Sequence, residues 1–152
     1  MRYLAAAAIL VATSTAQADV YGLSVGGYGG GTRGTLSRHF EPRTWLRPEL
    51  AISMWRGPNG SAIQLTAVPM LRYDLSARWF IEGGIGVSYF TRTDFGRSNI
   101  TTRFQFADQL GIGYELSSQN SIGLRLSHFS NAGIKEPNPG AEVVEVTYRV
   151  RF

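Results

Sequence analysis

The C-terminal segment of this chain alternates strictly along its length. One parity holds the apolar residues Val144, Val146, Tyr148, Val150 and Phe152, and the other holds the mostly polar residues Val143, Glu145, Thr147, Arg149 and Arg151. Successive side chains of a β-strand point to opposite faces. Residues 142–152 are therefore predicted to form a strand with one apolar and one polar face.

The same two-residue period recurs along the chain and predicts eight strands in a single domain. The expected strands cover about residues 20–32, 35–46, 48–56, 62–75, 78–92, 102–116, 120–131 and 142–152. Gly57-Pro58-Asn59-Gly60 and Pro137-Asn138-Pro139-Gly140 are turn-forming sequences between them. The Gly26–Gly31 cluster and the pairs Gly84/Gly86 and Gly111/Gly113 precede no helical pattern. We interpret them as strand bends and as space for bulky neighbours, not as a nucleotide-binding loop.

Two architectures accommodate such strands. A soluble sandwich or lipocalin-like barrel turns the apolar face inward, whereas a membrane barrel turns it outward to lipid. The polar face carries Gly, Ser and Gln besides charges, aromatic residues lie near strand ends, and the last strand ends at Phe152. These features favour an eight-stranded antiparallel transmembrane β-barrel, closed because an open sheet edge in lipid leaves backbone groups unpaired.

The first 18 residues have the composition of a secretory signal peptide. Arg2 is followed by the apolar run 4–12 and by the small-x-small sequence Ala16-Gln17-Ala18. The run is shorter than the roughly 20 residues that a membrane-spanning helix needs. We expect residues 1–18 to be cleaved on export and residues 19–152 to form the barrel; the alternative is a short N-terminal anchor helix.

Charge and composition narrow the function. The net charge of +4, without a run of basic residues, argues against nucleic acid as a partner. The chain has no cysteine, which removes thiol catalysis and cysteine metal ligands. No other cluster of metal ligands stands out, so neither a metal nor a cofactor is expected.

Three polar residues near the C-terminus interrupt the apolar parity. His128 and Ser130 continue the apolar face of residues 122–126, and Glu142 continues that of residues 144–152. A polar group that faces lipid is unfavourable unless it is partnered or functional, and a base, a hydroxyl and a carboxylate are the components of a serine hydrolase. With both termini in the periplasm, all three side chains would lie on the outer wall near the outer-leaflet boundary.

Neighbouring strands set the contacts expected at this site. A register that pairs Ser130 with Glu142 would place His128 diagonal to Glu142, within reach of a long side chain. Asp108 breaks the same face on the preceding strand. It either supports His128 or, as we prefer, is a solvated or structural carboxylate.

Three local sequences carry a family resemblance: His128-Phe129-Ser130-Asn131-Ala132-Gly133, the Pro137–Gly140 turn with Glu142, and Phe104-Gln105-Phe106-Ala107-Asp108. They resemble the lipid A 3-O-deacylase (PagL) family, loosely over residues 20–60 and tightly over 79–152. The resemblance implies an eight-stranded outer-membrane barrel with a Ser/His/Glu triad on its lipid-facing surface. Such an enzyme removes the ester-linked acyl chain at the 3-position of lipid A.

By this resemblance Ser130 is the nucleophile, His128 the general base and Glu142 the group that orients His128. The nearest candidates for an oxyanion hole are Asn131, Gly133 and Asn138. The candidates for contacts with lipid A phosphates, which are otherwise ordinary loop charges, are Lys135, Arg92 and Arg97. The implied partner is lipid A or lipopolysaccharide in the outer leaflet of a Gram-negative outer membrane, with a homodimer also considered.

Other functions stay open at this point. One is a non-enzymatic barrel for adhesion or structural anchoring. Another is a different outer-membrane lipid enzyme, such as a phospholipase or an acyltransferase, that uses the same three groups. A soluble lipocalin-like carrier is the third alternative.

Overall fold

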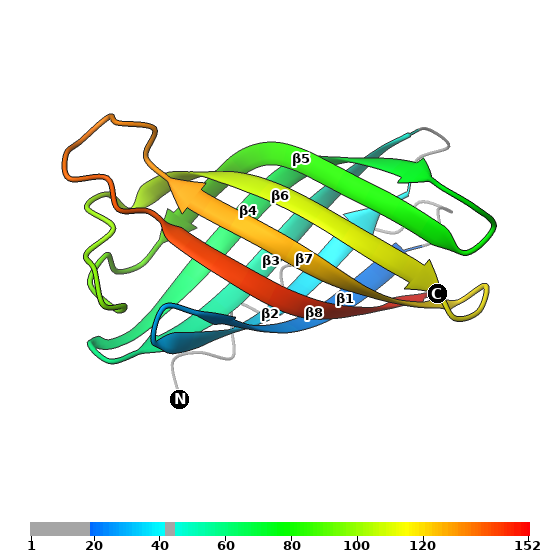
Figure 1. The fold of residues 1–152 in the computed structure, drawn as a ribbon, viewed down its shortest axis with the longest axis horizontal. Helices are drawn as coiled ribbons and strands as arrows, with labels where there is room; N and C mark the ends of the chain where they lie inside the picture. The colour runs from blue at the N-terminus through cyan, green and yellow to red at the C-terminus, as the bar shows by residue number, and fades with distance from the viewer. Residues whose placement is uncertain (1–18, 42–44) are drawn as a thin grey trace.

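The structure is a computed structural model that describes residues 19–41 and 45–152. The expected signal peptide at residues 1–18 lies outside the described residues. Consecutive antiparallel strands form a closed barrel in which β1 also pairs with β8, as predicted (Figure 1). The strands are β1 (Asp19–Tyr28), β2 (Gly31–Phe40), β3 (Leu46–Gly57), β4 (Gly60–Asp74), β5 (Trp79–Phe90), β6 (Phe104–Glu115), β7 (Asn120–Ser130) and β8 (Ala141–Arg151). No helix in the described residues is long and apolar enough to cross a membrane.

The first hairpin differs from the sequence-based prediction. β1 ends at Tyr28 and not at residue 32, and β2 covers residues 31–40 and not 35–46. The turn lies at Gly29 and Gly30, where Gly30 has a φ of 92° that side-chain-bearing residues rarely adopt. Two glycines interpreted as strand bends therefore form the turn. Residues 42–44 of the predicted second strand lie outside the described residues.

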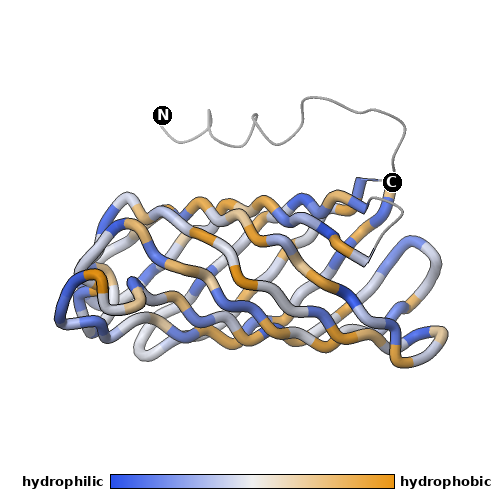
Figure 2. The backbone as a smooth tube through the Cα atoms, turned by 90° about the horizontal axis from the view of Figure 1, so that it is seen from above, coloured by the Kyte–Doolittle hydropathy of each residue, from blue (hydrophilic) through white to orange (hydrophobic). Residues whose placement is uncertain are grey.

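The outer wall of the barrel is apolar and its interior is polar. Leu23, Val25 and Val146 are each more than half exposed, whereas the intervening Ser24 and Glu145 are buried. Figure 2 shows this alternation as successive changes in hydropathy along each strand. An apolar exterior around a polar interior is the arrangement of a barrel that spans a membrane.

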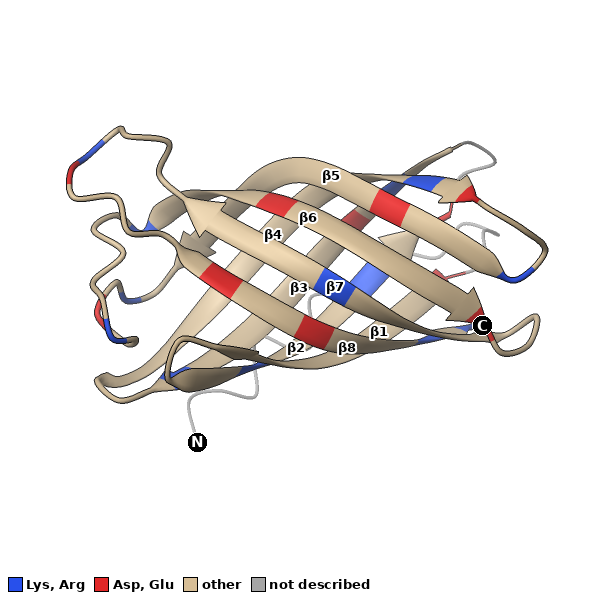
Figure 3. Cartoon of the chain, in the orientation of Figure 1, with Lys and Arg blue, Asp and Glu red and all other residues tan. Residues whose placement is uncertain are grey.

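The connections distinguish the two ends of the barrel. The C-terminus and the short connections 75–78 and 116–119 lie at one end, and the longest described connections, 91–103 and 131–140, lie at the other (Figure 1). Short turns face the periplasm and long loops face outward in outer-membrane barrels, so 91–103 and 131–140 are the extracellular loops. Both loops carry acidic and basic residues (Figure 3).

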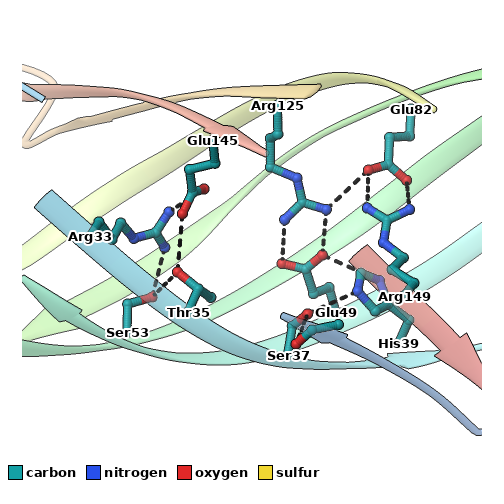
Figure 4. Close-up of polar contacts among 11 residues, drawn as sticks. Arg33, Thr35, Ser37, His39, Glu49, Ser53, Glu82, Arg125, Glu145 and Arg149 are labelled. Carbon is teal, nitrogen blue, oxygen red and sulfur yellow. Dashed lines mark hydrogen bonds and ion pairs between the residues drawn. The ribbon is translucent and has the colours of Figure 1, made fainter. Parts of the chain in front are cut away.

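Ion pairs fill the middle of the lumen. Arg125 donates to both carboxylate oxygens of Glu49 at 2.8 and 2.7 Å and to Glu82 at 3.0 Å, and Arg149 donates to the other oxygen of Glu82 at 2.8 Å. Figure 4 shows these side chains reaching across the barrel from different strands. The network leaves the barrel interior packed rather than open as a channel.

An aromatic cluster closes the extracellular end of the lumen. Trp55 packs against Phe90 and Phe129 from the wall and against Phe95, which belongs to loop 91–103. Since the lumen is closed, a ligand has to approach the protein from outside the barrel.

Glycine makes room for an aromatic ring elsewhere in the barrel. A methyl group on Gly113 would lie 2.1 Å from the ring of Phe80.

Candidate active site

β7 and β8 bring two of the three candidate groups face to face. His128 lies directly opposite Glu142 in the strand ladder, and its Nδ1 is 3.5 Å from Oε1 of Glu142. The predicted register, with Ser130 opposite Glu142 and His128 diagonal, is therefore wrong by two residues. A shift of two residues keeps every side chain on its own face, so both side chains still project from the outer wall, 41% and 77% exposed.

Ser130 is the last residue of β7. It lies on the same face as His128, because His128 precedes it by two residues in the strand. Gly140 lies beside both side chains, since a methyl group there would be 3.4 Å from Cε1 of His128 and 3.7 Å from Cβ of Ser130. Nδ1 of His128 is turned to Glu142, which leaves Nε2 as the nitrogen available to Ser130. Glycine at position 140 keeps the space between imidazole and serine unfilled, and its φ of 63° suits glycine.

Asn131 organises the extracellular loop that follows Ser130. Its buried side chain accepts the Gly133 N–H at 2.9 Å and donates to the Lys135 carbonyl at 2.9 Å, while its own backbone N–H donates to Oδ1 of Asn138 at 3.1 Å. The N–H groups of Asn131 and Gly133 that were candidate oxyanion donors are therefore already used in hydrogen bonds within the loop. Among the described contacts of the three candidates, only the side-chain NH₂ of Asn138 is left available to a ligand.

Asp108 on β6 lies directly opposite His128 in the neighbouring ladder and is half-buried. Both residues line a groove of about 720 Å³ on the outer wall. The rest of its lining is mainly apolar and crosses β6, β5 and β4 as far as Leu46, including Leu126, Leu110, Ile85, Leu71 and Trp45. A groove of this kind can hold a hydrocarbon chain with its polar end near His128.

A second Ser/His/Glu arrangement, which the sequence analysis missed, lies inside the barrel (Figure 4). Nε2 of His39 is 3.0 Å from Oγ of Ser37, and Nδ1 of His39 is 3.2 Å from Oε2 of Glu49. All three side chains are buried, and Glu49 is also held by Arg125. The cavity beside His39 measures about 20 Å³, room for one water molecule and not for a lipid. We interpret this inner arrangement as packing of the lumen.

Replacement of each histidine is expected to affect ester hydrolysis differently. His128→Gln is expected to lower ester hydrolysis at least about a thousandfold, since it removes the candidate base. His39→Gln is expected to retain activity within about twofold. A lipid cannot reach the buried His39, although the hydrogen-bond geometry of its arrangement resembles that of a triad. Initial rates on a lipid ester, with heat-modifiable gel migration as the check on folding, compare the two. If a folded His39→Gln protein lost activity and His128→Gln kept it, the chemistry would lie inside the barrel.

The three basic residues considered for phosphate contacts lie apart from one another. Arg97 lines a hollow next to Glu142, and Arg92 lies against the β3–β4 turn, where a methyl group on Gly60 would be 2.6 Å from its Nη1. Lys135 is exposed in loop 131–140. Only Arg97 among them therefore adjoins the candidate site through a hollow.

The barrel is closed, with an apolar outer wall, a filled polar lumen and polar groups at its extracellular rim. These features define an integral β-barrel of the outer membrane. The chain belongs to the lipid A 3-O-deacylase (PagL) family, whose sequence profile it matches over residues 21–151. The family expected from the sequence resemblance is thereby confirmed.

Two curated relatives carry the name lipid A deacylase PagL. The chain is 48% identical over 112 residues to the protein of Bordetella bronchiseptica, which covers 70% of this chain and 62% of that protein. It is 36% identical over 101 residues to the protein of Pseudomonas aeruginosa, which covers 63% of this chain and 58% of that protein. The aligned region thus spans about three fifths of the length of these relatives.

Solved structures agree with the fold and the location. The crystal structure of the outer membrane enzyme PagL superposes with a TM-score of 0.77 at 27% identity and covers 86% of this chain and 98% of that chain. Neisserial surface protein A superposes with a TM-score of 0.62 at 13% identity, over 90% of this chain and 95% of that chain, a likeness of fold alone. The predicted outer-membrane location is confirmed.

Proposed function

We propose that this protein is a lipid A 3-O-deacylase, an ester hydrolase that removes the acyl chain at the 3-position of lipid A. The observation that carries the proposal is the position of Ser130, His128 and Glu142 on the outer rim of a PagL-family barrel. The ester of a membrane lipid lies at the boundary between hydrocarbon and headgroups. Lateral diffusion in the outer leaflet would therefore bring it to this rim.

In the proposed chemistry, Oγ of Ser130 attacks the ester carbonyl while Nε2 of His128 takes its proton. Collapse of the tetrahedral intermediate breaks the bond to the sugar oxygen, which leaves with the proton from His128. Water then hydrolyses the acyl–serine ester, with His128 again as the base. Glu142 orients the imidazole through Nδ1 and stabilises its protonated form. All three groups come from one chain, so the proposal needs no second copy.

The proposed oxyanion donor is the amide of Asn138. Its Oδ1 accepts the backbone N–H of Asn131 at 3.1 Å, which fixes the orientation of the amide group near Ser130. The NH₂ of the same amide is then free to donate to an oxyanion. In this proposal Asn131 and Gly133 shape the loop. Asp108 stays a structural carboxylate beside the groove, because Glu142 and Ser130 take the two ring nitrogens of His128.

Purified protein in detergent micelles, incubated separately with lipid A and with phosphatidylethanolamine, tests the proposal. Lipid A is expected to lose the mass of one 3-position hydroxyacyl chain, and the phospholipid is expected to stay intact. Mass spectrometry of the lipids and of the released fatty acids gives the result. Fatty acid released only from the phospholipid would indicate a phospholipase, and no release from either lipid would indicate a non-enzymatic barrel.

A further inference from the structure

Two hollows flank the pair formed by His128 and Glu142. The outer-wall groove begins at His128 on the β6 side. A second hollow, of about 440 Å³, lies on the β1 side at the extracellular rim, between loop 91–103, the β1–β2 turn and the start of β8. We call it the rim pocket, and its lining includes Tyr28, Phe95, Arg97, Pro139, Gly140 and Glu142. The candidate site thus lies where an apolar groove meets a more polar pocket.

Arg97 supplies the positive charge of the rim pocket, and glycines determine where its side chain lies. A methyl group on Gly30 would be 2.7 Å from Nε of Arg97 and 3.3 Å from its Cγ, so the side chain lies directly over the β1–β2 turn. The preceding Gly96 packs against the ring of Tyr28, since a methyl group there would be 3.2 Å from Cε2. The exposed side chain of Arg97 therefore lies beside the β1–β2 turn and lines the pocket.

The guanidinium of Arg97 has no ion pair within residues 19–41 and 45–152, in contrast to Arg33 and Arg125 in the lumen. Of the nearby acidic groups, Glu142 is paired with His128, and Asp94 accepts a hydrogen bond from Asn59 at 3.0 Å. A planar set of N–H donors in a concave site matches the geometry of a phosphate. The charge of Arg97 also offsets the repulsion between Glu142 and an anionic ligand.

We propose that the rim pocket binds the phosphorylated sugar headgroup of the substrate and that Arg97 contacts a phosphate. This inference rests on the proposed function. With the headgroup in the rim pocket and an acyl chain in the groove, the ester between them falls at the boundary where His128 and Glu142 meet. Contacts on both sides of the reacting bond would select which ester reaches Ser130. Arg92 and Lys135 line neither hollow.

Arg97→Gln is expected to raise KM for phosphorylated lipid A about tenfold and to leave kcat within about twofold, because it removes a charge-assisted binding contact. The same variant should hydrolyse a p-nitrophenyl acyl ester, which carries no phosphate, at the wild-type rate. Arg103→Gln is the matched control, since Arg103 is an exposed arginine of the same loop that lines neither hollow. Steady-state kinetics on both substrates provide the comparison.

Binding measurements separate this inference from the proposed function. Ser130→Ala and Ser130→Ala/Arg97→Gln are compared for affinity to phosphorylated lipid A, to its dephosphorylated form and to inorganic phosphate. Weaker binding of the phosphorylated lipid alone in the double variant supports the rim pocket, even if the wild type deacylates nothing. Equal binding by the two proteins overturns the inference and leaves wild-type deacylation untouched. Inorganic phosphate bound as tightly as the lipid would also overturn it, as a free-phosphate site.

Discussion

Ser130→Ala is expected to lower the rate of lipid A deacylation by at least about a thousandfold, because alanine cannot form the acyl–enzyme ester. Hydrogen-bond donors and lipid-binding surfaces remain in the variant, so a small residual rate above the uncatalysed reaction is expected. Initial rates of fatty-acid release from lipid A by the purified protein measure the loss. Mass spectrometry of lipid A from cells that express either protein shows whether the 3-position hydroxyacyl chain is retained.

Ser127→Ala is the matched control on the same strand. Ser127 faces the lumen, is fully buried and has no hydrogen-bond partner for its Oγ among the described residues. Its replacement should therefore leave both the fold and the deacylation rate near the wild-type values. A Ser130→Ala protein that folds and deacylates at the wild-type rate would place the nucleophile elsewhere.

The two-residue period explains why the fold and the orientation of the site were predictable. Parity assigns each strand residue to the lipid face or to the lumen, and it placed His128, Ser130 and Glu142 on one face before any contact was known. The same period cannot define register, because a shift of two residues preserves both faces. The observed pairing of His128 with Glu142 was for that reason missed by two residues.

Turn positions and loop contacts are not predictable from the two-residue period. The first hairpin turns at Gly30, but five glycines between residues 26 and 31 offer several positions for that turn. Proximity along the chain to Ser130 makes Asn131 an oxyanion candidate. Its buried hydrogen bonds to Gly133 and Lys135 depend on the path of the whole loop. The shared parity of Ser37 and His39 was the available signal for the inner arrangement, and the uncertain boundaries of that segment hid it.

Arg125→Met is expected to lower the free energy of unfolding by about 3–5 kcal/mol, because it leaves a buried carboxylate without its cation. Glu49 is 1% exposed, and among the described residues the variant would leave it the contact with Nδ1 of His39 at 3.2 Å but no cationic arginine. Glu82 still receives Arg149 at 2.8 Å, so the main uncompensated charge is that of Glu49. Guanidinium unfolding in detergent micelles, followed by heat-modifiable gel migration, measures the change. Arg103→Met, an exposed arginine replaced in the same way, should change the stability by about 0.5 kcal/mol or less.

The double variant Arg125→Met/Glu49→Gln tests whether charge or packing causes this loss. It removes the buried carboxylate together with its cation and preserves most of the side-chain volume. Replacement of a buried ion pair by neutral groups of similar size is often close to neutral, so the double variant should regain most of the lost stability. A double variant as unstable as Arg125→Met alone would show that the guanidinium acts through its packing and through its bond to Glu82. Recovery would show that paired charge is what allows such polar side chains to fill a narrow barrel.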